Sequence, residues 1–179
     1  MSFIGKWFRH AWIVVLVASV VILLDQWTKT LVRTNLAKFE EVEVLGRYLM
    51  LQHVDNYGAA FGIFQNGGMI FALVASVVTI GVMWYVTQIP VDRILIRVLL
   101  GLQVGGAVGN LIDRFQQGYV TDFVKMGIPG FYYWPIWNVA DASIVIGVIG
   151  LGIYIIWEDT VASRNKTKMT VTEVDGHES

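Results

Sequence analysis

Long stretches without a charged side chain divide this sequence and restrict the folds that are open to it. Five of them cover residues 10–24, 56–91, 98–112, 126–140 and 142–157. A helix that crosses the hydrocarbon core of a bilayer needs about 20 mostly apolar residues, so stretches of this kind are typical of membrane spans. The composition agrees, because 55% of the 179 residues are hydrophobic and only 15% are charged. We therefore interpret the chain as an integral membrane protein.

The hydropathy pattern predicts an all-α membrane protein that folds as a bundle of four transmembrane helices. We place the spans near residues 10–31, 68–88, 94–113 and 138–157. Residues 1–160 then form a single membrane domain. Residues 161–179 are polar and lack hydrophobic periodicity, so we expect a mobile tail there.

Glycine recurs at every fourth residue along the third predicted span, at Gly101, Gly105 and Gly109. Residues four apart lie on one face of a helix. Small residues on such a face let a neighbouring helix backbone approach closely. We interpret these glycines as a helix-packing surface and assign no chemistry to them.

Lysine and arginine give the orientation of the bundle. Four spans put both termini on one side, and that side holds seven of these residues against six on the other. The seven lie in shorter segments close to the spans, where the positive-inside rule has most weight. This distribution favours cytoplasmic termini and places the opposite helix ends near the outer leaflet.

Three predicted spans carry a carboxylate at a similar depth. Asp25 lies 16 residues after Arg9, Asp113 lies 16 after Arg97, and Asp141 precedes Glu158 by 17. With a rise of 1.5 Å per residue, each acid lies about 24 to 26 Å from the cytoplasmic face of a core about 30 Å thick. A carboxylate inside a membrane helix is costly and marks a functional site by default. We expect a polar layer near the outer leaflet.

Two segments outside the spans have the alternating pattern of strands. Residues 40–54 partly alternate polar and apolar side chains around Gly46, and Asp122 lies in the alternating segment GYVTDFVKM. The run FYYWPIW at 131–137 then gathers aromatic residues that favour a membrane–water interface. This run is either a plain interfacial anchor or a platform for a lipid-linked substrate.

Paired carboxylates are the chemistry that the sequence offers. Two acids held close together share a proton, so that one acts as a base towards water and the other as an acid. Asp122 and Asp141 are the natural pair, because 18 intervening residues can fold one onto the other. Asp25 and Asp113 compete for this role, or are helix-end carboxylates held by Lys29 or Arg114.

The sequence lacks the residues that metal-dependent enzymes and nucleic-acid-binding proteins need. The chain has no cysteine, and its three histidines have no recognisable metal-ligand spacing, so we expect no metal. The net charge of −1 offers no basic footprint for nucleic acid. A small proton- or cation-coupled transporter that uses Asp25, Asp113 and Asp141 is the alternative, although transport sites tend to lie near the bilayer midplane.

Five blocks of the sequence resemble the successive signatures of the bacterial lipoprotein signal peptidases, also called signal peptidase II. They are LDQWTK (24–29), NYGAAFG (56–62), GNLIDR (109–114), VTDF (120–123) and WNVAD (137–141). Any one block is weak, but five in order at suitable spacing are specific. The resemblance runs from Asp25 to Asp141.

This resemblance implies a membrane-embedded aspartyl endopeptidase that cuts prolipoproteins on the amino side of a diacylglyceryl-modified cysteine. It implies a catalytic pair, Asp122 and Asp141, and no organic cofactor. It also implies a polar shell that supports substrate and pair: Asn56, Asn110, Asp113, Arg114, Asn138, Asp25 and Lys29. The fold it implies is four helices capped on the outer side by a small β-sheet and a short helix, in the bacterial cytoplasmic membrane. We expect a monomer whose partners are membrane lipids and the lipidated substrate.

Overall fold

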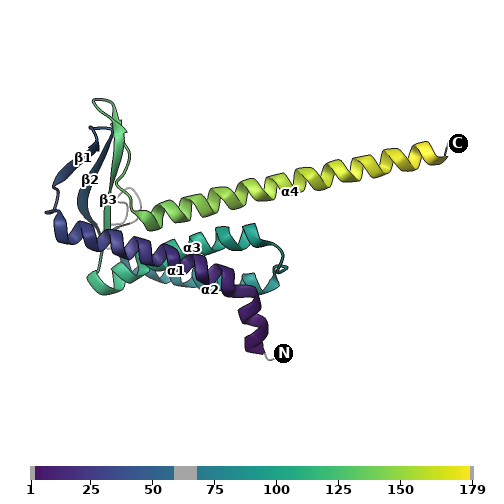
Figure 1. The fold of residues 1–179 in the computed structure, drawn as a ribbon, viewed down its shortest axis with the longest axis horizontal. Coiled ribbons are helices and arrows are strands. Elements are labelled where there is room, and N and C mark those ends of the chain that lie inside the picture. Colours follow the sequence, from purple (N-terminus) through teal and green to yellow (C-terminus); the bar gives the residue numbers. More distant parts are fainter. Residues whose placement is uncertain (1–2, 59–67, 178–179) are drawn as a thin grey trace.

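The computed structural model of the protein describes residues 3–58 and 68–177. These residues form four α-helices, one 3₁₀-helix and a four-stranded sheet. The elements are α1 (Phe3–Asn35), β1 (Glu41–Leu45), β2 (Leu49–Asn56), α2 (Gly68–Tyr85), η2 (Val86–Gln88), α3 (Ile94–Gln117), β3 (Val120–Ile128), β4 (Tyr132–Tyr133) and α4 (Val139–His177). Figure 1 shows the sheet at one end of the helices and α4 extending past the others at the opposite end.

Helix α3 is the centre of the molecule, because α1, α2 and α4 all pack against it. The glycine-stripe prediction is confirmed. A Cβ at Gly101 or at Gly105 would lie 2.7 Å from a valine Cβ of α1, and one at Gly109 would lie 2.7 Å from Asp25 Oδ2. Gly106 lies against the backbone of Ala140 on α4. The missing side chains therefore bring the polar segments of three helices close together.

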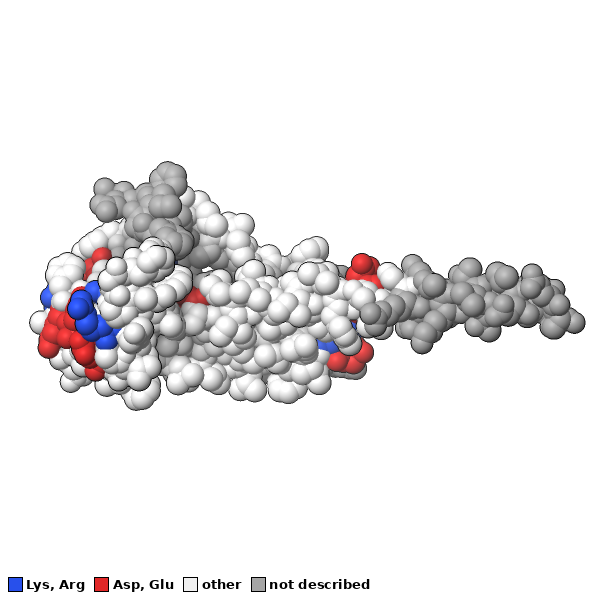
Figure 2. All heavy atoms as spheres, turned by 90° about the horizontal axis from the view of Figure 1, so that it is seen from above, with Lys and Arg blue, Asp and Glu red and all other residues white. Residues whose placement is uncertain are grey.

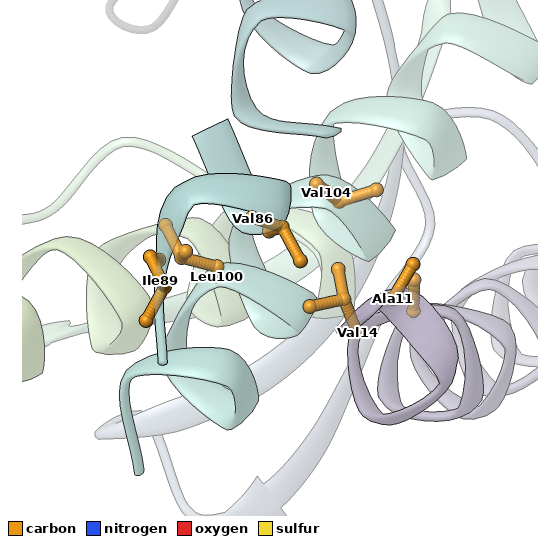
Figure 3. Packing of buried hydrophobic residues seen from close by; sticks show 7 residues of the cluster. Ala11, Val14, Val86, Ile89, Leu100 and Val104 are labelled. Carbon is orange, nitrogen blue, oxygen red and sulfur yellow. The ribbon is translucent and has the colours of Figure 1, made fainter. Parts of the chain in front are cut away.

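A small apolar core holds the helices together at the end away from the sheet (Figure 3). Ala11 and Val14 of α1 meet Leu100 of α3 there, together with Val86 and Ile89 from the connection after α2. All five side chains are at most 6% exposed. This core fixes one end of the bundle and leaves the sheet end to be held by polar contacts.

The outer surface of the helices suits a lipid environment. Leu23, Ile80 and Ile156 are each about 70% exposed although they are strongly apolar. Figure 2 shows charged side chains at the two ends of the helical body, with an uncharged band between them on this face. Large exposed apolar surfaces of this kind mark a membrane or an interface.

Three of the four predicted spans are confirmed by length and composition among the described residues. They are His10–Asn35, Ile94–Gln117 and Val139–Val161. The predicted span near 68–88 is helical, but its apolar part, Ala72–Gln88, is shorter than 18 residues. That this segment crosses the membrane stays a prediction.

Residues 161–177 continue α4 as one helix to His177, where the sequence suggested no periodic structure. Figure 1 shows this part of α4 projecting beyond the other helices. Helical backbone there needs no tertiary partner, because each carbonyl is bonded within the helix itself. The mobility of the segment stays a prediction.

The sheet confirms the predicted strands and adds one. Its strands are all antiparallel in the order β1-β2-β3-β4, and the β1–β2 hairpin turns at Gly46, whose φ of +49° favours glycine. β4 was not predicted, because two tyrosines inside an aromatic run carry no alternation. Within the described ranges, no short helix lies beside the sheet, since η2 is at the opposite end.

Candidate active site

Asp122 lies on β3, directly after the end of α3. The helix ends at Gly118, whose φ of +80° lets the chain turn sharply into the strand. The carboxyl of Asp122 is almost fully buried, at 3% exposure, and accepts two amide hydrogen bonds. Asn56 Nδ2 lies 2.8 Å from Oδ2, and Asn138 Nδ2 lies 2.6 Å from Oδ1.

Asp141 lies in the first turn of α4 and is held by the residue before the helix. Asn138 Oδ1 accepts from the Asp141 backbone N–H at 2.9 Å, while Asp141 Oδ2 accepts from the Asn138 N–H at 3.3 Å. This reciprocal pair is a capping box, which fixes the start of a helix. The predicted span near 138–157 placed Asn138 inside the helix. Instead Asn138 precedes the helix and caps it.

Asn110 joins the two acids from α3. Its Nδ2 donates to Asp141 Oδ1 at 2.7 Å, and its Oδ1 accepts from Asn138 Nδ2 at 3.2 Å. Because Asn138 also donates to Asp122, both carboxyls belong to one hydrogen-bonded network. Asn110 and Asn138 therefore link the two carboxyls across α3, β3 and the start of α4.

Burial and charge set the proton affinity of Asp122. Desolvation, followed by the nearby charge of Asp141, raises the pKa of Asp122 from 3.8 to about 7, against the opposing hydrogen bonds of Asn56 and Asn138. A carboxyl with this pKa is populated in both protonation states near neutral pH. It can therefore give or take a proton near neutral pH.

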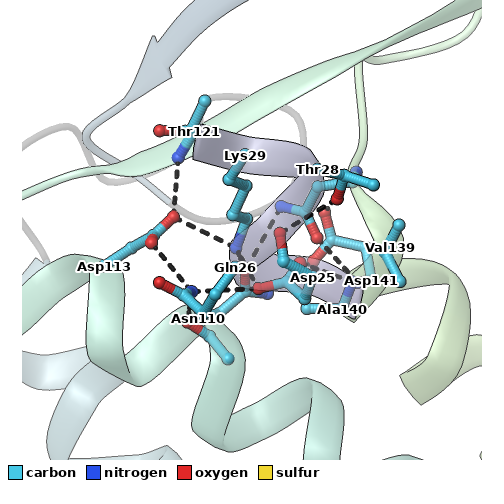
Figure 4. A network of polar contacts seen from close by, with 12 residues as sticks. Asp25, Gln26, Thr28, Lys29, Asn110, Asp113, Thr121, Val139, Ala140 and Asp141 are labelled. Carbon is cyan, nitrogen blue, oxygen red and sulfur yellow. Dashed lines mark hydrogen bonds and ion pairs between the residues drawn. The ribbon is translucent and has the colours of Figure 1, made fainter. Parts of the chain in front are cut away.

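Asp25 and Asp113 lie beside this pair but have partners of their own (Figure 4). Lys29 Nζ lies 2.8 Å from Asp25 Oδ2 and 3.0 Å from Asp113 Oδ2, and all three side chains are fully buried. Lys29 also donates to Asn110 Oδ1 at 2.9 Å. The ammonium thus joins the ion-paired acids to the network of Asp122 and Asp141.

Further contacts show that Asp25 and Asp113 hold other segments in place. Asp25 Oδ1 accepts from the Ala140 N–H at 3.0 Å, and Asp113 Oδ2 accepts from the Thr121 N–H at 3.0 Å. These backbone groups belong to the residues directly before Asp141 and Asp122. The structure therefore favours a supporting position for Asp25 and Asp113, one of the two readings that the sequence left open.

Gln26, Arg33 and Thr121 also belong to this cluster, although sequence reasoning did not single them out. Gln26 Nε2 lies 3.1 Å from an oxygen of each of Asp25 and Asp113, and Arg33 Nη1 lies 3.0 Å from Thr121 Oγ1. Gln26 and Thr121 lie inside the blocks LDQWTK and VTDF, so the resemblance could have identified them as site residues. Arg33 follows its block by four residues, the spacing that places it on the Lys29 face of α1.

Arg114 reaches towards the loop after β2. Its guanidinium donates to the Asn110 carbonyl oxygen at 3.2 Å and to the Gly58 carbonyl oxygen at 3.4 Å. Asp113, the ion-pair partner that the sequence offered for it, is held by Lys29. Both of these partners are carbonyl oxygens, which the fork of donors on a guanidinium suits.

Two cavities meet at Asp122. One of about 720 Å³ is mainly apolar and contains both Asp122 and Asp141, with Val120, Ile144 and Val145 among its lining residues. The other, of about 820 Å³, is lined by more polar residues of the sheet, and Asp122 also faces it. Trp134, Pro135 and Ile136 line both, so the aromatic run separates the two cavities. The remainder of block 56–62 lies outside the described residues after Gly58.

Known proteins share both the sequence and the fold. The family model for signal peptidase II, described as "Signal peptidase (SPase) II", matches residues 17–157. The lipoprotein signal peptidase of Symbiobacterium thermophilum is 42% identical over 134 residues, which cover 75% of this chain and 88% of that protein. The one from Halalkalibacterium halodurans is 39% identical over 151 residues, or 84% of this chain and 96% of that protein.

Solved structures agree with the sequence relatives. A bacterial membrane enzyme determined by the in meso method at 2.3 Å has a TM-score of 0.75 and 30% identity, covering 88% of this chain and 91% of its own. Another, determined at 1.9 Å, has a TM-score of 0.71 and 31% identity, covering 86% of this chain and 94% of its own. With the matched region running from α1 through the paired acids to α4, the chain belongs to the signal peptidase II family of membrane proteases.

Proposed function

We propose that this protein is an aspartyl endopeptidase that hydrolyses the peptide bond before the diacylglyceryl-modified cysteine of prolipoproteins, with Asp122 and Asp141 as the catalytic pair. The family and the names of the relatives support the substrate class. The single observation that carries the residue assignment is the network in which Asn138 and Asn110 join the two carboxyls beside one cavity.

The reaction follows from one proton shared by two acids. The ionised carboxyl takes a proton from a water molecule, whose oxygen attacks the scissile carbonyl carbon, while the protonated carboxyl gives its proton to the carbonyl oxygen. The carbon–nitrogen bond then breaks as the carboxyl that took the proton of the water passes it to the leaving nitrogen, while the other carboxyl takes back a proton from a hydroxyl of the intermediate. Because Asp122 has a pKa of about 7, we expect activity to decline as the pH rises above 7 and the pair loses this proton.

The surrounding residues hold the pair and the substrate. Asn56 and Asn138 orient the carboxyl of Asp122, and Asn110 orients that of Asp141. Arg114 lines the cavity and offers donors to carbonyl oxygens of the substrate. Asp25, Lys29 and Asp113 brace the segments that carry these groups.

The apolar cavity beside the pair suits acyl chains. Most of its lining is apolar and comes from α4 and the aromatic run, with Trp134 on the wall shared by both cavities. A lipidated cysteine is held at the membrane surface by such chains, which places the bond before it at that level. Trp134→Ala should therefore raise KM more than it lowers kcat.

The protein works as a monomer in the bacterial cytoplasmic membrane, with both termini cytoplasmic and the pair near the outer leaflet. The distribution of lysine and arginine along the chain supports this orientation. A transporter finds no support, because fully buried Lys29 already neutralises charge on Asp25 and Asp113 and the relatives are peptidases.

The deciding experiment is mass spectrometry of a prolipoprotein peptide incubated with the purified protein in detergent. We expect cleavage just before the cysteine only when that cysteine carries diacylglycerol. Asp122→Asn and Asp141→Asn should each abolish cleavage while the protein stays folded. A variant that keeps near-normal turnover removes its residue from the mechanism, and a folded wild type that cleaves neither peptide refutes the assignment.

A further inference from the structure

Arg33 lies in the last turns of α1, outside the groups that contact the paired acids. Its Nη1 donates to Thr121 Oγ1 at 3.0 Å and lies 3.6 Å from Asp113 Oδ1. Its other terminal nitrogen donates to Thr30 Oγ1 at 3.2 Å on the same helix. The side chain is 21% exposed, so this guanidinium spans from the helix surface to a buried strand.

Thr121 is the point where β3 is fixed to the helices. It is fully buried, and both of its polar groups are engaged: the N–H by Asp113 Oδ2 at 3.0 Å and the Oγ1 by Arg33. Figure 4 shows the first of these bonds, with Asp113 between Thr121 and Lys29. A charged donor makes the second bond stronger than a bond between neutral groups.

The next residue along the strand is Asp122. Thr121 and Asp122 are neighbours on one strand, and their side chains point to opposite faces of the sheet. A shift of the strand at Thr121 therefore also moves the Asp122 carboxyl relative to the groups that donate to it. The bonds to Asn56 and Asn138, at 2.8 and 2.6 Å, tolerate displacements of only a few tenths of an ångström before they weaken. The position of Thr121 therefore controls the alignment of Asp122.

We propose that Arg33 is a positioning residue, which acts through Thr121 to hold the carboxyl of Asp122 in its working place. This inference rests on the proposed function, in which Asp122 is catalytic. It extends the site to a residue of α1 that touches neither substrate nor the paired acids.

A purely electrostatic role for Arg33 is the competing explanation. Lys29 and Arg33 together balance the formal charges of Asp25 and Asp113, so the guanidinium could serve only to neutralise that cluster. The two roles differ at Thr121. Thr121→Val keeps the charge of Arg33 and the backbone bond to Asp113 but removes the hydroxyl acceptor, in nearly the same shape.

The test compares Thr121→Val, Arg33→Met and the double variant in the cleavage assay with lipidated peptide. We expect each single variant to lower kcat about tenfold to a hundredfold with KM changed less than about twofold, the size of one lost charged hydrogen bond. The kcat of the double variant should be no lower than that of the less active single variant, because both substitutions remove the same contact. The decline in kcat at high pH should also move to higher pH, since a misaligned Asp122 loses donors that favour its ionised form.

Matched controls separate position from general damage. Thr121→Ser keeps the hydroxyl and should retain wild-type kcat, while Thr30→Val removes the other hydroxyl partner of Arg33 without touching β3 and should also be neutral. Thermal unfolding in detergent confirms that each variant is folded. If Thr121→Val does not fold, Thr121→Ala replaces it, since it also removes the hydroxyl that accepts from Arg33.

Unchanged kcat and pH profile in both Thr121→Val and Arg33→Met overturn the inference, as does loss in Arg33→Met alone. An equal loss in Thr30→Val does so too. Failure of the proposed function can be told apart from failure of this inference. If the proposed function is wrong, the wild type does not cleave the peptide or Asp122→Asn remains active. Where wild type cleaves and Asp122→Asn does not, silent Arg33 and Thr121 variants refute only this positioning role.

Discussion

Replacing Lys29 with methionine should destabilise the protein more than any other change to a single charge at the sheet end. Lys29 is fully buried and joins Asp25 and Asp113 at 2.8 and 3.0 Å. Methionine keeps a similar length and apolar stem but leaves two buried carboxylates facing each other. Breaking a buried ion pair by removing one partner costs about 3 to 5 kcal/mol, because the remaining charge is uncompensated.

That cost converts into a thermal shift. For a chain of 150 to 250 residues, 1 kcal/mol lowers Tm by about 2 to 4 °C, so Lys29→Met should unfold about 6 to 20 °C below wild type. The assay is thermal unfolding in one detergent, followed by intrinsic tryptophan fluorescence. Lys125→Met is the matched control, since Lys125 pairs with Glu41 on the sheet and the side chain of Glu41 is 42% exposed. It should change Tm little.

A Lys29→Met protein that unfolds within 2 °C of wild type, on the order of the shift for 1 kcal/mol, would refute the reasoning. It would mean that Asp25 and Asp113 do not need the ammonium for their burial. Adding Asp113→Asn to Lys29→Met should recover part of the lost stability, because one of the two uncompensated charges is removed.

The raised pKa of Asp122 makes ionisation unfavourable in the folded state, so wild type should lose stability relative to Asp122→Asn as the pH rises from about 4 to about 7, measured by Tm. Gly105→Ala puts a Cβ 2.7 Å from Val21 Cβ and should lower Tm by several degrees, whereas Gly81→Ala has open space and should not. Asn138→Ala removes a helix cap worth about 1 kcal/mol and a donor to Asp122, so both Tm and kcat should fall. Deleting residues 165–179 should leave the cleavage rate unchanged, and a loss would show that the end of α4 contributes.

Several elements of the fold were predictable because they depend on local pattern. Charge-free stretches gave the helices, the alternation around Gly46 gave the β1–β2 hairpin, and the glycine spacing gave the packing surface of α3. β4 could not be predicted, because Tyr132 and Tyr133 join the sheet through pairing with Gly127 and Ile128 of β3. Two paired residues leave no periodic signal in sequence.

The candidate site divides in the same way. The sequence by itself determined which groups can carry the chemistry, since acids and amides are rare in apolar helices and their cost there demands partners. It did not reveal the capping pair Asn138 and Asp141, because a spacing of three residues fits a shared helix face as well as the reciprocal bonds of a cap.

Only the tertiary structure decided which partners those groups have. Asp25, Asp113, Asp122 and Asp141 come from α1, α3, β3 and α4. The spacing of four residues lets Lys29 pair with Asp25 on α1, but no local rule assigns it to Asp113 rather than to Asp122 or Asp141. That choice depends on how closely α1 and α4 approach α3. The glycines allow the close approach, but they do not determine which side chains meet. Energies of buried charges depend on distance and desolvation, and both are properties of the packed molecule rather than of the order of its residues.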